Sequence, residues 1–133
     1  NYTSDLGVAL GSGGRIALYT KSALAFSRDN LACNGSSYSG TSNGFKTKIA
    51  SCGTIFIKDP SMANGELILK QDASVASASS AKASVPILED ITLDGIELCG
   101  RVILAVETGK TLTLPGGEEQ KIVSDDSSAV RAV

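Results

Sequence analysis

The residues able to carry chemistry in this chain are three cysteines and several acidic groups. The 133-residue chain contains no histidine, so a serine or cysteine nucleophile would lack the imidazole base that such sites ordinarily use. Cys33, Cys52 and Cys99 form no C-x-x-C pair and have no histidine with which to complete a zinc site. We therefore expect no nucleophilic triad, no metal centre and no cofactor.

Four carboxylates close together in the sequence are the remaining basis for catalysis. Glycoside hydrolysis uses two carboxyl groups that face each other across a cleft. The acidic group comprises Glu89, Asp90, Asp94 and Glu97, and Arg101 and Lys58 are available as cations. A solvated acidic edge explains the same residues. We predict that the chain is not an enzyme, with a polysaccharide lyase or hydrolase as the alternative.

Two short motifs resemble ligand-binding or catalytic signatures but lack the required context. Gly11-Ser12-Gly13-Gly14 leads into the predicted strand 15–19, whereas the dinucleotide fingerprint opens a helix. The segment 79–82 matches S-x-x-K without the companion S-D-N and K-T-G motifs. We interpret the first as a turn and the second as a chance match.

The charge distribution excludes two further classes of function. The net charge is −2, from 12 basic and 14 acidic residues spread along the chain, whereas a nucleic-acid interface needs a basic stripe. The longest apolar stretch is Val102–Val106, far short of the roughly 20 residues that cross a bilayer. We predict no nucleic-acid partner and no membrane span.

Short aliphatic runs separated by turn residues predict an all-β protein. Turn signals stand at Asn64-Gly65, Asp94-Gly95 and Pro115-Gly116-Gly117. The segment 73–83 has no large apolar residue at helical spacing, so we expect a loop or an extended strand there. The predicted strands cover residues 15–19, 54–58, 66–70, 91–93, 96–98, 102–107 and 111–114.

The strand residues are aliphatic, and the whole chain has only three Phe and three Tyr. Aliphatic side chains stacked on successive coils favour a parallel β-helix, a type of solenoid. An antiparallel β-sandwich, which usually has a more aromatic core, is the alternative.

About half of the chain, residues 11–70, resembles a module of large secreted bacterial surface proteins. The resemblance lies in Gly13-Gly14-Arg15-Ile16-Ala17-Leu18-Tyr19, in Cys52-Gly53-Thr54-Ile55-Phe56-Ile57-Lys58-Asp59 and in Gly65-Glu66-Leu67-Ile68-Leu69. These segments are similar to the module's GGGRIAxY, GGAGTIYIKD and GxLIVDN patterns. The module's second glycine-rich stretch is replaced by the polar segment 36–48. The resemblance implies export and a right-handed parallel β-helix.

We predict a single right-handed parallel β-helix domain over residues 1–123, with about five to six short coils. Within the segment 1–10, Leu6, Val8 and Leu10 alternate with small residues, so we interpret this segment as a docking strand. Residues 124–133 are predicted to form a C-terminal tail or linker.

The cysteines leave two alternatives open. Cys33 and Cys52 would close a loop of roughly 20 residues, a length at which a disulfide contributes about 3 kcal/mol. Three buried free thiols are the other alternative. The module resemblance implies that Cys33 and Cys52 occupy small-residue positions on neighbouring coils, which favours a coil-to-coil disulfide. Cys99 has no obvious disulfide partner inside the chain, so we interpret it as a candidate for a bridge between subunits.

We predict a non-enzymatic, secreted or cell-surface structural module. It would be a segment of a surface adhesin, joined to a longer parent chain, or a fibre subunit that associates with itself. One alternative is a polysaccharide-binding or polysaccharide-cleaving β-helix, with Tyr19, Tyr38 and Phe56 as carbohydrate contacts. A second alternative is a pilin-like β-sandwich subunit whose partner completes its sheet.

Overall fold

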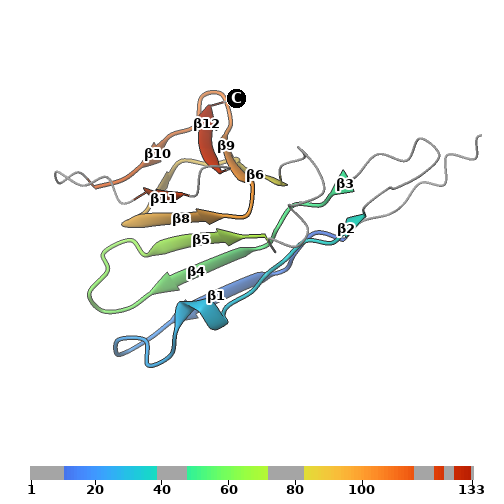
Figure 1. The fold of residues 1–133 in the computed structure, drawn as a ribbon. Helices are drawn as coiled ribbons and strands as arrows, with labels where there is room; N and C mark the ends of the chain where they lie inside the picture. The colour runs from blue at the N-terminus through green and yellow to red at the C-terminus, as the bar shows by residue number, and fades with distance from the viewer. Residues whose placement is uncertain (1–10, 39–47, 72–82, 116–121, 125–127, 133) are drawn as a thin grey trace, which may run out of the picture.

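The computed structural model describes residues 11–38, 48–71, 83–115, 122–124 and 128–132, and Figure 1 draws them as coloured ribbon. The described residues form short strands and a single turn of 3-10 helix, which confirms the all-β prediction. The elements are β1 (Arg15–Tyr19), η1 (Arg28–Asn30), β2 (Ser37–Tyr38), β3 (Lys48–Ile49), β4 (Thr54–Lys58), β5 (Glu66–Lys70), β6 (Ala83–Ile87), β7 (Ile91–Thr92), β8 (Gly95–Cys99), β9 (Val102–Val106), β10 (Leu112–Thr113), β11 (Ile122–Ser124) and β12 (Ala129–Ala132).

The largest sheet has five strands in the order β1-β4-β5-β8-β11 (Figure 1). β5, β8 and β11 are parallel to one another, and β1 is parallel to β4. The two groups meet at an antiparallel pairing between β4 and β5. The sheet is therefore mixed, with one reversal of direction between β4 and β5.

From β5 onward, pairing recurs at every third strand. β6, β9 and β12 form a parallel three-stranded sheet, and β7 pairs in parallel with β10. The registers place Leu67 beside Ile96, and Leu69 beside Leu98. Strands that are separated by two others in the sequence thus lie side by side, with aliphatic residues at matching positions.

The main core lies between the sheets. Alternate side chains of a strand point to opposite faces, so Leu67 and Leu69 of β5 contribute to this core whereas Ile68 does not. We call it the inner core, and its buried members are Cys52, Leu67, Leu69, Ile87, Leu93, Ile96, Leu98, Val102 and Leu104.

A second, smaller core covers the opposite face of the sheet at β1, β4 and β5. We call it the outer core, and its buried members are Cys33, Ile55, Ile57 and Ile68. Leu24 and Leu31, from the connection between β1 and β2, pack against it. β5 is consequently buried on both faces.

The turn before β5 is held by a carboxylate from the turn before β8. Asp94 Oδ2 accepts hydrogen bonds from the backbone N–H groups of Asn64 at 2.7 Å and Gly65 at 2.8 Å. Gly65 has φ of 89°, and a Cβ atom there would lie 2.4 Å from the Phe56 ring. A glycine is therefore required at this turn, as the Asn-Gly dipeptide indicated.

The structure differs from the sequence predictions in three places. The segment 129–132, predicted as part of a tail, forms β12 and pairs with β9, so the tail prediction is wrong there. β6 was not predicted as a strand. The antiparallel pairing of β4 with β5 departs from the parallel pairing that a β-helix predicts throughout. No helix in the described part of the chain is long and apolar enough to cross a membrane.

Candidate functional site

Three backbone segments that are distant in sequence meet at the start of β1 and β4. The segments are residues 11–14, 33–36 and 50–53, and the Gly53 N–H donates to the Cys33 carbonyl at 2.5 Å. A Cβ atom at Gly53 would lie 2.2 Å from the Cys33 sulfur. This approach is too close for any side chain at residue 53, which explains the glycine.

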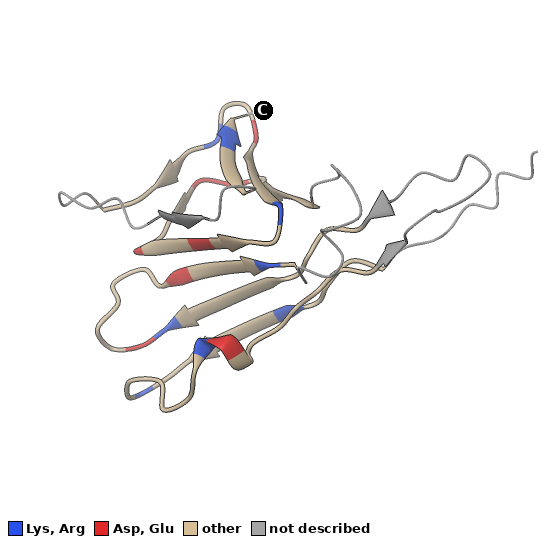
Figure 2. Ribbon diagram, in the orientation of Figure 1, with Lys and Arg blue, Asp and Glu red and all other residues tan. Residues whose placement is uncertain are grey.

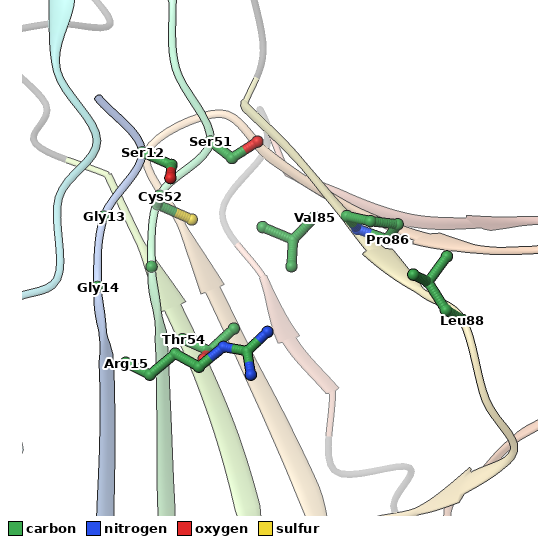
Figure 3. Close-up of a pocket in the computed structure, with 11 residues that line it drawn as sticks. Ser12, Gly13, Gly14, Arg15, Ser51, Cys52, Thr54, Val85, Pro86 and Leu88 are labelled. Carbon is green, nitrogen blue, oxygen red and sulfur yellow. The ribbon is translucent and has the colours of Figure 1, made fainter. Parts of the chain in front are cut away.

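A cavity of about 290 Å³ lies between this meeting point and β6 (Figure 3). The β6 side contributes Val85, Pro86 and Leu88, and the opposite side contributes mostly glycine and serine. In Figure 3 the Arg15 side chain extends from β1 past Thr54 toward β6. The cavity is at the lower end of the size range of small-molecule sites.

The edge of β6 that faces this cavity is protected against strand addition. The backbone groups of Ala83 and Ile87 bond toward β9, so those of Ser84 and Pro86 face the cavity because direction alternates along a strand. The Ser84 carbonyl already accepts a hydrogen bond from Ser51 Oγ at 2.6 Å. Pro86 has no N–H to offer, and proline is a common protection of edge strands.

Cys33 and Cys52 are free, buried thiols in the structure, and the disulfide between them stays a prediction. Cys33 belongs to the outer core and Cys52 to the inner core, and the Cys33 thiol donates to the Gly14 carbonyl at 2.8 Å. Burial raises the pKa of Cys52 to about 11, with a smaller rise from the nearby Cys33 and a partly offsetting backbone hydrogen bond. Cys52 is therefore protonated near neutral pH and a weak nucleophile.

Cys99 and the segment 1–10 are the two places predicted to contact another subunit. Cys99 is half-buried at the end of β8, and its proposed bridge to another subunit stays a prediction. Leu6, Val8 and Leu10 lie outside the residues that the structure describes.

The three predicted carbohydrate contacts are not all brought together. The rings of Tyr19 and Phe56 are 5.6 Å apart between centroids, with an interplanar angle of 51°. Tyr19 is 72% exposed, and Lys58 is its neighbour in the β1–β4 register. Tyr38 lies in β2, which belongs to a separate two-stranded sheet. Two of the three aromatic residues therefore form a pair on one surface.

The predicted acidic group is distributed among turns and ion pairs. Asp94 holds the turn before β5, and Asp90 accepts a hydrogen bond from the Thr111 backbone N–H at 2.8 Å. Glu97 lies 3.2 Å from the Lys70 ammonium group, and Glu89 is exposed. Within the described residues, no group of three or more His, Cys, Asp or Glu side chains is placed to hold a metal ion.

Charged side chains link η1 to the sheet. Arg28 forms an ion pair with Glu66 of β5, and Lys70 lies 3.7 Å from Asp29 of η1. Figure 2 shows acidic and basic residues side by side in this area. Lys58, predicted as a catalytic cation, lies at the end of β4, and Arg101 lies in the corner between β8 and β9 with φ of 63°.

Sequence reasoning missed Gln71, which joins the meeting point to β5. Gln71 is 4% exposed, and its side-chain amide bonds both backbone groups of Gly35, at 3.1 Å to the N–H and 2.8 Å to the carbonyl. The two residues are 36 positions apart, and a single glutamine after an apolar strand carries no signal for such a contact.

Comparisons with known proteins found no matching family model, curated protein or solved structure.

Proposed function

We propose that the chain is a non-enzymatic structural module of an extracellular surface protein, built as a right-handed parallel β-helix. The observation that carries this proposal is the pairing at every third strand. β5, β8 and β11 stack in one sheet, and β6, β9 and β12 stack in another. Each return of the chain to the same sheet adds one coil, as in solenoid proteins.

The stacked aliphatic residues support the same proposal. Val85, Leu104 and Val130 lie at matching positions of β6, β9 and β12. Leu69 and Leu98 lie at matching positions of β5 and β8, and both are almost completely buried. Such aliphatic stacks make each coil depend on its neighbours, which suits a protein whose role is to extend and to present a surface.

The two ends of the stack differ, which supports a defined direction of extension. The edge of β6 is protected by Pro86 and by the Ser51–Ser84 hydrogen bond, so further coils are disfavoured there. Among the described residues, β11 and β12 each pair on one side only. We propose that additional coils, from a longer chain or from another subunit, continue from β11 and β12.

The chemistry of the polar residues supports a role other than catalysis. Asp94 and Asp90 accept hydrogen bonds from backbone N–H groups of turns. Both carboxylates therefore have a structural role. The raised pKa of Cys52 makes this thiol a poor nucleophile.

Negative-stain electron microscopy of the purified chain, with and without reductant, tests the proposal. Regular fibres would identify a polymerising subunit, and their loss under reductant would implicate Cys99. Dispersed particles would identify a module that functions within a longer chain. Release of products from a panel of neutral and acidic polysaccharides would contradict the non-enzymatic role.

Carbohydrate binding is a second candidate function, favoured by the Tyr19–Phe56 pair. Tyr19 offers an exposed ring, and the cation Lys58 is its neighbour in the β1–β4 register. An aromatic ring beside a cation suits an acidic sugar, through ring stacking and charge. Binding of an acidic polysaccharide that Tyr19→Ala weakens, with Leu88→Ala as control, would support this function.

A further inference from the structure

β1 presents one unpaired side. It is the terminal strand of the five-stranded sheet, and among the described residues it pairs with β4 alone. The Thr54 N–H bonds the Gly14 carbonyl at 3.1 Å, and the Thr20 N–H bonds the Lys58 carbonyl at 3.0 Å. Even-numbered residues of this segment therefore direct their backbone groups toward β4, since direction alternates in a parallel pair.

The backbone groups of Arg15, Ala17 and Tyr19 consequently point to the open side. All three residues are exposed. The strand has no proline, in contrast to the β6 edge with Pro86. An extended, unprotected edge strand is a template for pairing with another strand.

We propose that the open edge of β1 pairs with β1 of a second copy of this chain, antiparallel and around a two-fold axis at Ala17. In this register Ala17 faces its own copy, and Arg15 of each chain faces Tyr19 of the other. The outward-pointing residues then exchange about six backbone hydrogen bonds. The two five-stranded sheets become one continuous sheet.

Charge and size favour this register. Each Arg15 residue lies opposite Tyr19 of the other copy, and a rotation of its side chain away from Thr54 (Figure 3) would bring the guanidinium within the roughly 6 Å of a cation–π contact with the exposed Tyr19 ring. The two Arg15 residues lie at opposite ends of the interface, so like charges stay apart. The small Ala17 side chains meet at the axis.

The other face of β1 is complementary as well. Ile16 of one copy lies opposite Leu18 of the other, and both are half-buried against the outer core. Aliphatic cross-strand pairs of this kind stabilise antiparallel strands. A slip of one residue would turn Ile16 and Leu18 away from each other, and would pair inward-facing with outward-facing backbone groups.

The dimer goes beyond the proposed structural role and does not rest on it. It requires only the β1–β4 pairing and the residues of β1. The β1 variants test the dimer alone. The experiment can therefore distinguish a parallel β-helix that lacks this dimer from a different all-β fold that forms it.

Sedimentation velocity from low micromolar to several hundred micromolar protein tests the proposal. We expect a reversible monomer–dimer equilibrium in the wild type. Ala17→Pro removes an N–H that the fold does not use and should raise the dimer Kd about tenfold or more, with an unchanged melting temperature. Leu88→Ala, which removes another exposed apolar side chain that is 58% exposed, should leave the dimer Kd unchanged.

A wild type that stays monomeric throughout this range, or an association that Ala17→Pro leaves unchanged, would overturn the proposal. An isotope-filtered NMR experiment on a mixture of labelled and unlabelled chains checks the register independently of any variant. We expect intermolecular contacts between Arg15 and the Tyr19 ring. Intermolecular contacts that involve other strands instead would contradict the β1 interface.

Discussion

The five-stranded sheet joins two regions of the molecule, an N-terminal region from residue 11 to β4 and a C-terminal region from β5 to β12. The strands of the two regions bury their aliphatic residues on opposite faces of this sheet. In the C-terminal region the strands pair in parallel, and their apolar residues face the inner core between the sheets. In the N-terminal region the buried residues of β4, Ile55 and Ile57, face the outer core, under the connection that contains η1. The same type of aliphatic strand thus serves two modes of burial.

β5 is the strand that the two regions share. Leu67 and Leu69 belong to the inner core, whereas Ile68 belongs to the outer core. A strand buried on both faces shows a continuous apolar run, Leu67-Ile68-Leu69, rather than alternation. The two cores are joined through this strand, so we expect them to unfold together.

The largest expected loss of stability comes from shortening a buried β5 side chain in either core. Leu69 is 0% and Ile68 is 1% exposed, so Leu69→Ala and Ile68→Ala should each lower the free energy of unfolding by about 2–5 kcal/mol. Urea unfolding followed by circular dichroism measures both. The exposed Thr92→Ala serves as control, with a change within about 0.5 kcal/mol. Two separate transitions in either variant would show that the regions unfold independently.

A charge at residue 71 should weaken the link between the regions. Gln71→Glu replaces a buried amide that bonds both backbone groups of Gly35, and an ionised carboxylate cannot donate to the Gly35 carbonyl. We expect a loss of about 2–3 kcal/mol at neutral pH.

The pH dependence of Gln71→Glu provides its internal control. Burial raises the pKa of a carboxyl group in the folded state, so the variant should be least destabilised below about pH 4 and lose stability as pH rises through the folded pKa. Thermal melts of variant and wild type across this range measure the difference. A difference that does not change with pH would contradict the buried contact.

The close approach in the N-terminal region predicts a contrast between two glycines. A Cβ atom at Gly53 would lie 2.0 Å from the Gly14 carbonyl oxygen, whereas one at Gly14 meets nothing within 4 Å. Gly53→Ala should cost about 1–3 kcal/mol, and Gly14→Ala should stay within about 0.5 kcal/mol. Equal melting temperatures for the two variants would contradict the meeting of the three backbone segments.

The smallest effect is expected from the ion pair that joins η1 to β5. Arg28 and Glu66 are partly exposed, so their interaction should contribute no more than about 1 kcal/mol. A double-mutant cycle with Arg28→Ala and Glu66→Ala, at low and high salt, measures it. A larger coupling free energy that salt does not lower would show that the ion pair between η1 and β5 stabilises the fold more than its partial exposure predicts.

Much of the strand pattern could be predicted from the sequence because the signals are local. The strands at residues 15–19, 54–58 and 66–70 coincide with those of the structure, since aliphatic runs bounded by Gly and Asn-Gly determine them. β6 contains Pro86 and two small residues, and β12 is a four-residue run with an arginine. Both are weak strand signals that pairing with β9 overrides.

The features that escaped prediction depend on contacts between distant residues. Spacing alone could not place Cys33 and Cys52 in different cores, because it does not determine which face of a sheet each side chain takes. The antiparallel pairing of β4 with β5 is an exception, because the short segment 59–65 that joins them does not provide the dozen or so residues of a parallel crossover. The protected edge at Ser84 and Pro86 depends on Ser51, a residue 33 positions away.

The most direct test of the stacked coils is the NMR measurement of backbone contacts between β5 and β8 in the isotope-labelled chain. The parallel register predicts contacts between amide and Hα protons around Leu67–Ile96 and Leu69–Leu98, and no short Hα–Hα contacts between these strands. Strong Hα–Hα contacts between β5 and β8 would indicate antiparallel pairing. That result would contradict the parallel β-helix.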